Sequence, residues 1–289
     1  MKKMIFFIFS LFIFLSCETL DNLFKPSQST SSGSNNSKNE TTIKSNQQTT
    51  STGNSNQQKQ TGTPLSTTQS SANVNRRGDP DSKNWDIVSL DTAANVDYLS
   101  NNEKDVILEM NKARADPKKY AELYIQPMLQ YNWGGPFGPN SYLAPGKAVY
   151  TSTQEGKNGI QLCINDLAKR QNMPPLNPEK GLFLAARDHV NDTGPKGITG
   201  HTGNDKSTMA QRINRYGKWS GGSGENISYG YSIGRDIVVQ LLIDDGVPNR
   251  GHRNNILNKN FKVAGNSIGN HTKFTYMCVI NYANDYTSN

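Results

Sequence analysis

Hydrophobic residues recur at helical spacing through much of the chain after residue 100. Ser100 and Glu103 form a capping-box pattern, which predicts a helix that begins just after Ser100. Asp116 and Pro117 end that helix and begin a second one, because proline fits the first turn of a helix but not its interior. Three- and four-residue spacing of apolar positions predicts four further helices: 158–171, one opened by Asn177-Pro178, a short one capped by Ser207, and 233–244.

Three later segments favour strands instead. Residues 226–231, 263–268 and 274–282 are short, rich in apolar and β-branched side chains, and the last alternates along its length. The segment 126–157 is rich in glycine, proline and aromatic residues, so we expect a long irregular excursion there. Helices on both sides of a small, mostly antiparallel sheet are therefore expected, which is an α+β fold.

The first residues have the pattern of an export signal. Two lysines precede the almost wholly apolar stretch 5–15, which is too short to cross a bilayer as a mature helix. The stretch ends at Leu15-Ser16-Cys17, which is similar to a bacterial lipobox, where the cysteine is acylated, for example with palmitate. We therefore expect a lipoprotein signal peptide at 1–16 and a membrane anchor on Cys17 that places the protein in the bacterial cell envelope, outside the cytoplasm. An ordinary cleaved signal is the alternative.

Composition divides the rest of the chain into two parts. Residues 17–84 are dominated by Ser, Thr, Asn and Gln, with no aromatic residue between Phe24 and Trp85, so we expect a disordered tether. Residues 85–289 are long enough for one domain with a sizeable core. The net charge of +7 for the whole chain falls to +3 in that domain, which holds 22 basic and 19 acidic residues. This balance, without a basic patch interleaved with aromatic residues, does not favour a nucleic-acid partner.

Three short motifs in a fixed order carry the candidate chemistry: Gly200-His201-Thr202-Gly203, Gly224-Glu225-Asn226-Ile227 and Gly251-His252-Arg253-Asn254-Asn255-Ile256-Leu257. Imidazoles and carboxylates are good metal ligands and good proton carriers. An Asn-x-x-Arg-x-x-Pro-x-x-Tyr-Ala run also begins at Asn111. In their order and spacing these motifs resemble the CAP superfamily: cysteine-rich secretory proteins, antigen 5 and pathogenesis-related proteins, also called SCP-like. The resemblance covers roughly residues 100–283.

The resemblance implies a three-layer α-β-α sandwich and a cleft in which two histidines and two acidic residues often bind a divalent metal. By motif position these residues are His201, His252 and Glu225, with Asp244 or Asp245 as the second acid. Zn²⁺ suits such a donor set and requires neutral imidazoles, so its binding should weaken in acid. The alternative is that the two histidines only hydrogen-bond Glu225 and hold loops together.

Other polar residues favour structural roles. His189 shares a helix face with apolar residues and is expected to be a core histidine, whereas His271 lies in a Gly-Asn turn and is expected at the surface. Cys163 and Cys278 either pair or remain two buried thiols. Arg253 either points to the mouth of the cleft or holds backbone carbonyls.

Three functions remain open on these grounds. The first is a binding module for a protein, small-molecule or lipid ligand, and the absence of a Ser/His/Asp or Cys/His signature favours it over an enzyme. The second is a metal-assisted hydrolase in which His201 and His252 hold the metal and Glu225 is the base. The third is a lipid or sterol carrier, which needs an apolar cavity walled by the excursion 126–157.

Overall fold

The computed structural model describes residues 12–13 and 82–289. Apart from residues 12–13, the predicted signal peptide lies outside the described residues, as do the acylation site at Cys17 and nearly all of the predicted tether. Within the described part of the chain, every helix falls short of the length and apolar character needed to cross a bilayer.

A four-stranded sheet forms the middle of the fold. Its spatial order is β5-β7-β8-β6, with β6 and β7 antiparallel to β8 and the short β5 parallel to β7. The bounds are β5 Asn177–Pro178, β6 Gly217–Tyr229, β7 Val263–His271 and β8 Thr275–Ser288. The three predicted strands fall largely within β6, β7 and β8. Each strand runs further than predicted, because pairing with β8 extends β6 through a Gly/Ser-rich stretch that has no alternation of its own.

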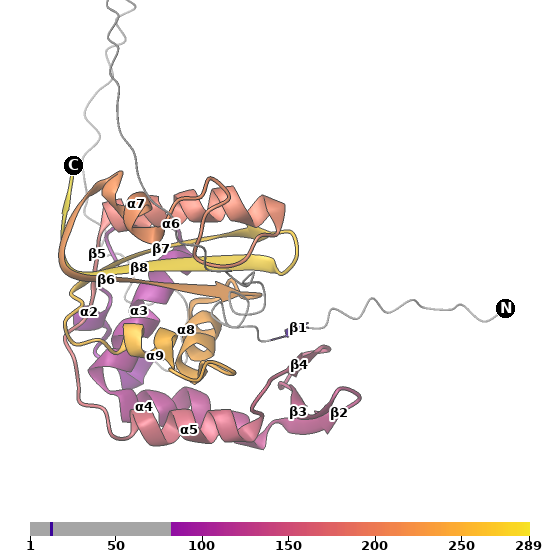
Figure 1. The fold of residues 1–289 in the computed structure, drawn as a ribbon. Helices are drawn as coiled ribbons and strands as arrows, with labels where there is room; N and C mark the ends of the chain where they lie inside the picture. Colours follow the sequence, from indigo (N-terminus) through magenta and orange to yellow (C-terminus); the bar gives the residue numbers. More distant parts are fainter. Residues whose placement is uncertain (1–11, 14–81) are drawn as a thin grey trace, which may run out of the picture. The chain divides into compact units, whose positions relative to one another are not determined.

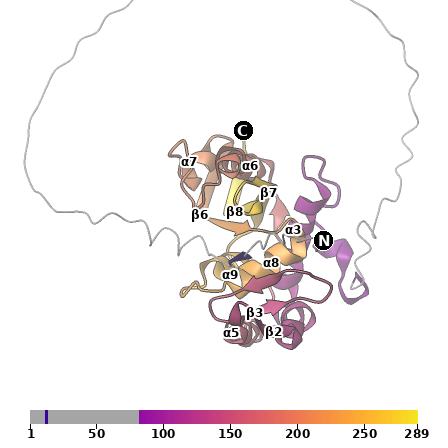
Figure 2. The same cartoon turned by 90° about the vertical axis from the view of Figure 1, so that its right-hand side faces the viewer.

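Helices cover both faces of this sheet (Figure 1), and the turned view shows the same order of layers (Figure 2). The helices α6 (Lys180–Thr193) and α7 (Met209–Asn214) lie on one face. The other face carries α3 (Asn101–Ala115), α8 (Gly234–Ile243) and α9 (Gly251–Ile256). Further from the sheet on that side lie α4 (Pro117–Tyr120) and α5 (Lys157–Leu167), and α2 is Ile87–Leu90. The expected three-layer α-β-α sandwich is therefore confirmed.

Side chains that cap the helices explain where the helices begin. The predicted capping box is present at α3, where the Glu103 carboxylate accepts the backbone N–H of Ser100 at 2.8 Å. The prediction for α7 is wrong by one residue, because Thr208, not Ser207, is its cap. Thr208 and Gln211 form a capping box of their own. The carbonyl of Ser207 instead accepts a hydrogen bond from Arg212 at 2.9 Å. Thr/Gln is as good a capping pair as Ser/Glu.

The expectation of an irregular excursion at 126–157 is wrong. A 3₁₀ turn, η3 (Gln126–Gln130), leads into the antiparallel hairpin β2 (Asn132–Gly135) and β3 (Gly138–Leu143), and β3 pairs with β4 (Tyr150–Ser152). The described strand β1 (Phe12–Ile13) runs parallel to β4. Gly134 and Gly138 have φ of 77° and 95°, so the glycines that suggested irregularity supply the left-handed backbone of a tight turn.

The core extends over both faces of β8. Met277 and Val279 pack with α6, while Cys278 and Ile280 face the cluster that includes α3 and α8. Strand β8 is therefore buried on both sides through its middle, as a sheet between two helical layers must be. Cys163 and Cys278 are both buried and free, and burial raises the pKa of each thiol, that of Cys163 to about 12.

Candidate functional site

The carboxylate of Glu225, on β6, joins two of the predicted motifs. One of its oxygens lies 2.8 Å from Nδ1 of His201, and the other accepts a hydrogen bond from Nη2 of Arg212 at 2.7 Å. The side chains of Glu225 and Arg212 are 2% and 1% exposed, whereas that of His201 is 31% exposed. Arg212 also donates to the carbonyl of His201 at 3.1 Å. A buried arginine thus neutralises the acid and fixes the loop that carries the histidine.

This environment sets the protonation of Glu225. Burial alone would raise the pKa of its carboxyl, but the hydrogen bond with His201 and the charge of Arg212 outweigh that effect and hold the pKa below its usual value. Glu225 is therefore an ionised group with both oxygens occupied. A carboxylate of lowered pKa is a poor proton acceptor, so this arrangement does not favour Glu225 as a general base.

His252 forms a second, separate pair with Asp244. Asp244 ends α8 in the left-handed conformation, with φ of 54°, a position that Asp tolerates better than most residues. This conformation turns its carboxylate toward α9, where it lies 2.6 Å from Nδ1 of His252 and accepts the backbone N–H groups of His252 at 2.9 Å and Arg253 at 3.2 Å. Of the two candidate acids, Asp244 is therefore the one that meets a histidine.

Asp245 has a different role. Its carboxylate accepts the backbone N–H groups of Gln154 at 2.6 Å and Glu155 at 2.9 Å. Glu155 in turn forms a two-point ion pair with Arg250, with both N–O distances 2.7 Å. The hydrogen bonds from Arg250 lower the pKa of Glu155. The loop between α8 and α9 is thereby tied to the end of the segment 126–157.

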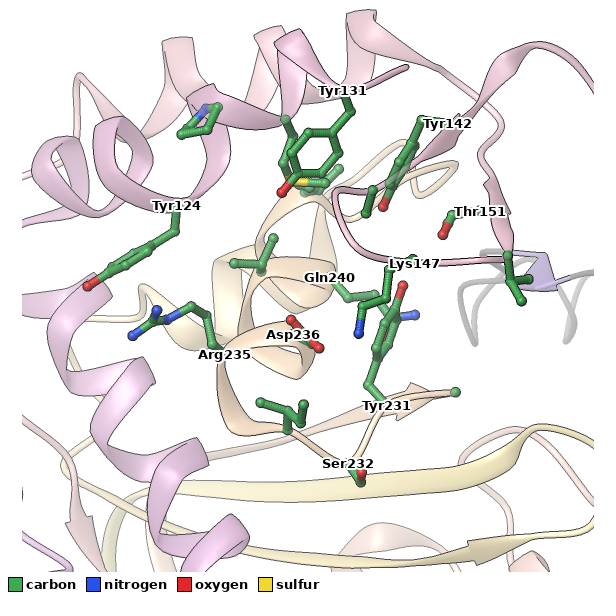
Figure 3. Close-up of a pocket in the computed structure, with 18 of the residues that line it drawn as sticks. Tyr124, Tyr131, Tyr142, Lys147, Thr151, Tyr231, Ser232, Arg235, Asp236 and Gln240 are labelled. Carbon is green, nitrogen blue, oxygen red and sulfur yellow. The ribbon is translucent and has the colours of Figure 1, made fainter. Parts of the chain in front are cut away.

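That segment forms one wall of a cavity of about 620 Å³. The other walls come from the π-helical turn η2 (Ala121–Ile125), from residues 230–233 and from α8. Five tyrosines line the cavity: Tyr124, Tyr131, Tyr142, Tyr231 and Tyr276. The ionisable side chains among its lining residues, apart from the tyrosines, are Lys147, Arg235 and Asp236. Its size and its mixture of aromatic and polar walls are those of a site for a small ligand (Figure 3).

Residues 161–282 match the model of the cysteine-rich secretory protein family, called CAP. This region is a CAP domain. An outer surface protein from Borrelia burgdorferi is a similar solved structure, with 19% identity and a TM-score of 0.34, over 45% of this chain and 96% of that protein. An extracellular protein containing an SCP domain from Bacillus anthracis str. Ames has 21% identity and a TM-score of 0.32, over 47% of this chain and 45% of that protein. No curated protein matches the chain.

The histidines of the CAP domain do not form the expected four-residue cluster. They belong to two pairs, His201 with Glu225 and His252 with Asp244, and Asp245 joins neither. Within residues 82–289 there is no group of three or more His, Cys, Asp or Glu side chains placed to hold a metal ion. Glu225 already has the buried cation of Arg212 as its counter-charge. The donor set therefore does not fit a zinc centre with three or four protein ligands.

The remaining histidines of the CAP domain are structural. His189 is a fully buried core residue, as predicted, with Nε2 2.8 Å from the carbonyl of Gly200. The prediction for His271 is wrong, because it is 1% exposed and its Nδ1 accepts the backbone N–H groups of Lys273 and Phe274. The imidazole fills the inside of the turn between β7 and β8, so a turn sequence does not make this side chain a surface residue.

The motif arginines are structural as well. The guanidinium of Arg253 donates to the carbonyl of Ile243 at 2.8 Å and is buried, which agrees with the second of the two predicted roles. Arg114, from the Asn-x-x-Arg run, donates to four carbonyls in two loops, including those of Pro174 and Phe261. Burial lowers the pKa of Arg114 to about 10.

Sequence reasoning named 126–157 as the wall of an apolar cavity for the carrier hypothesis, but it missed the tyrosine lining and the residues of the other walls. The residues that line the cavity come from η2 and η3, from the segment 131–151, from residues 230–233 and from α8, and no spacing rule connects these segments. The one signal was the density of aromatic residues in 126–157. That segment precedes residue 161, so the wall it supplies lies outside the region that matches the family.

Proposed function

We propose that the protein is a ligand-binding module of the bacterial cell envelope, and that its ligand occupies the tyrosine-lined cavity. The observation that carries this proposal is a cavity of about 620 Å³ in which aromatic rings and a few polar groups converge. The two histidine–carboxylate pairs support the site indirectly. They fix the loops after α6 and α8, and the second loop holds the end of the cavity wall through Asp245 and Arg250.

Hydrolysis at the histidines has less support. The catalytic roles predicted for His201, His252 and Glu225 require a metal with an open position or a free base. Glu225 has both oxygens bonded and a lowered pKa, and each histidine has its Nδ1 committed to a carboxylate. Neither pair offers a nucleophile.

A lipid carrier is the second candidate, and the rim of the cavity favours it. Val149 and Ile233, which line the cavity, are 44% and 53% exposed. Apolar side chains at the mouth of a cavity with polar walls suit an amphiphile whose head group enters and whose tail remains outside. A sterol fits less well, because its large apolar ring system would displace water from the tyrosine hydroxyls and charged groups in the walls and offer them few hydrogen bonds in return.

Binding to the cavity is tested with the full chain and two neutral aromatic probes, phenol and indole, by saturation-transfer difference NMR. We expect both probes to bind the unaltered protein and to lose binding in Val239→Trp, which fills the cavity from α8. Val88→Trp is the matched control, because Val88 is 81% exposed and does not line the cavity. Equal signals from Val239→Trp and the unaltered protein would refute the proposal.

The membrane anchor is a separate part of the proposal and rests on Leu15-Ser16-Cys17. Metabolic labelling with an alkyne analogue of palmitate is expected to mark the exported protein and to leave Cys17→Ser unmarked. Cys163 and Cys278 are internal controls, since both are buried. Label retained in Cys17→Ser would contradict acylation at that residue.

A further inference from the structure

The side chain of Asp236 stands out among the groups that line the cavity. It lies in the first turn of α8, in the middle of the cavity between Arg235 on one side and Lys147 and Tyr231 on the other (Figure 3). Within the described part of the chain its carboxylate accepts no hydrogen bond and forms no ion pair. Burial raises the pKa of Asp236, and the charges of Lys147 and Arg235 only partly oppose this rise.

A helix N-terminus favours a nearby negative charge, but that effect is small and leaves the carboxylate oxygens without partners. Partly buried carboxylates are normally paired or hydrogen-bonded, because desolvation is costly. An unpaired carboxylate that faces a cavity is therefore a group whose partner comes from outside the chain.

Three of the tyrosines that line the cavity lie near this carboxylate. The negative charge of Asp236 contributes to raised pKa values at Tyr131, Tyr142 and Tyr231, after the larger effect of burial, so all three hydroxyls are close enough to sense it. The rings of Tyr131 and Tyr142 have centroids 5.6 Å apart and are inclined by 45°. Aromatic faces carry negative electrostatic potential, so a group of tyrosine rings near an anion adds to its attraction for a cation. We call Asp236 and these three tyrosines the cage.

The two basic residues in the lining do not neutralise this cage. Arg235 contacts both oxygens of Glu109 at 3.4 Å and lies over the ring of Tyr124, 4.2 Å from its centroid. Its charge is therefore shared with Glu109. Lys147 is exposed on the loop between β3 and β4, and it forms no ion pair with Asp236. Solvent weakens the effect of its charge on Asp236 without removing it, and its flexible side chain can move when a ligand enters.

We propose that the cavity binds an organic ammonium group, which contacts the Asp236 carboxylate and lies between the rings of Tyr131, Tyr142 and Tyr231. This proposal names the ligand class for the site under Proposed function and rests on it. An ammonium of this kind is present both in free amines such as choline and in the head groups of zwitterionic lipids. The exposed Val149 and Ile233 at the rim are compatible with either source.

The decisive measurement compares choline with 3,3-dimethylbutan-1-ol, its neutral isostere in which carbon replaces nitrogen. Calorimetric titration of the full chain is expected to show choline binding at least about tenfold more tightly, a difference of about 1.4 kcal/mol. Asp236→Asn should abolish this preference and leave the affinity for the neutral isostere unchanged. Glu122→Gln is the matched control, because its carboxylate is exposed, lies beside Lys118 and is not among the groups that line the cavity. Equal affinities for the two probes in the unaltered protein would overturn the proposal.

Lys147→Gln provides an independent test of the charge balance. Removing the competing cation should tighten choline binding without changing the affinity for the neutral isostere, and an unchanged or weakened choline affinity would count against the cage. The source of the ammonium is tested by flotation with phosphatidylcholine vesicles against phosphatidylglycerol vesicles, using Cys17→Ser protein so that no acyl anchor contributes. Retention by phosphatidylcholine that is lost in Asp236→Asn identifies a lipid head group, whereas choline binding without retention identifies a free amine.

Failure of this proposal is distinguishable from failure of the proposed function. If phenol and indole bind in a Val239-dependent way while choline shows no preference over its isostere, the cavity is a ligand site and only the ammonium assignment is wrong. If none of these probes binds, both are wrong.

Discussion

Replacing Arg212 with methionine tests the claim that a buried cation holds the first histidine loop. Arg212→Met retains much of the side-chain volume but removes the guanidinium that neutralises Glu225, whose side chain is 2% exposed. Breaking one partner of a buried ion pair costs about 3–5 kcal/mol, because it leaves an uncompensated charge. With about 2–4 °C per kcal/mol for a domain of this size, the melting temperature should fall by roughly 6–20 °C.

The double variant Arg212→Met/Glu225→Gln separates the charge from the packing. It replaces the carboxylate that Arg212→Met leaves buried without its cation. We therefore expect the double variant to recover most of the free energy of unfolding lost in Arg212→Met, with a coupling energy of about 2–4 kcal/mol. Urea unfolding followed by far-UV circular dichroism at pH 7 measures all four members of the cycle. Equal destabilisation of the single and double variants would refute the reasoning.

The pH dependence gives a second check on the same pair. In the unaltered protein the pKa of Glu225 is lowered, so its contribution to stability is present above the unfolded pKa and is lost as pH falls through the lower folded value. Without Arg212, His201 is the main group left to oppose the effect of burial, so we expect the folded pKa of Glu225 to rise above the unfolded one. Protonation of Glu225 then stabilises Arg212→Met as pH falls. The difference in free energy of unfolding between this variant and the unaltered protein should therefore be smaller at pH 5 than at pH 7. If this free-energy difference is the same at pH 5 and pH 7, Glu225 is not the buried charge that loses its partner.

Four further outcomes follow from the site. Calorimetric titration of the full chain with zinc at neutral pH should show no tight binding, and the variant His201→Ala/His252→Ala should give the same result. Submicromolar zinc binding that is lost in this variant would show that the two histidines do bind a metal. Asp236→Asn should raise the melting temperature of the unligated protein at pH 7, because it removes a desolvated charge. In the unaltered protein, choline affinity should decline as pH falls through the raised pKa of Asp236. Calorimetric titrations with choline from pH 4 to 7 measure this decline, and an affinity that does not change with pH would contradict it. Arg250→Ala, which breaks the two-point ion pair with Glu155, should cost about 1–3 kcal/mol in urea unfolding, and an effect below about 0.5 kcal/mol would show that the pair does not hold the loop.

The elements that could be predicted are those whose cause is local in sequence. The capping box at Ser100 and Glu103 and the burial of His189 on an apolar helix face depend on residues three or four positions apart. The error at His271 has the opposite origin. Its Nδ1 accepts two backbone N–H groups of its own turn and its Nε2 meets Ile198, so its burial depends on a contact with another loop that the turn sequence does not show.

Local motifs also predicted only part of the candidate site. They identified His201, Glu225 and His252, but they did not identify all the residues that these side chains contact. Asp244 remained one of two alternatives because neighbouring aspartates are equivalent in sequence. The left-handed backbone at Asp244 separates them, since it turns one carboxylate back to His252 and sends the next one toward Gln154.

Asp236 shows why the cavity itself could not be predicted. In the predicted helix 233–244 the apolar positions identify the face that packs on the core, and an aspartate in the first turn has a sufficient local explanation as a helix-terminal charge. Its functional significance depends on what the polar face meets. That is decided by the β2–β3–β4 sheet, which brings Tyr142 over the start of α8 although more than ninety residues separate them in the chain. An unpaired carboxylate becomes informative only when the surrounding rings are in place, so this inference belongs to the three-dimensional structure and the choline titration is its direct test.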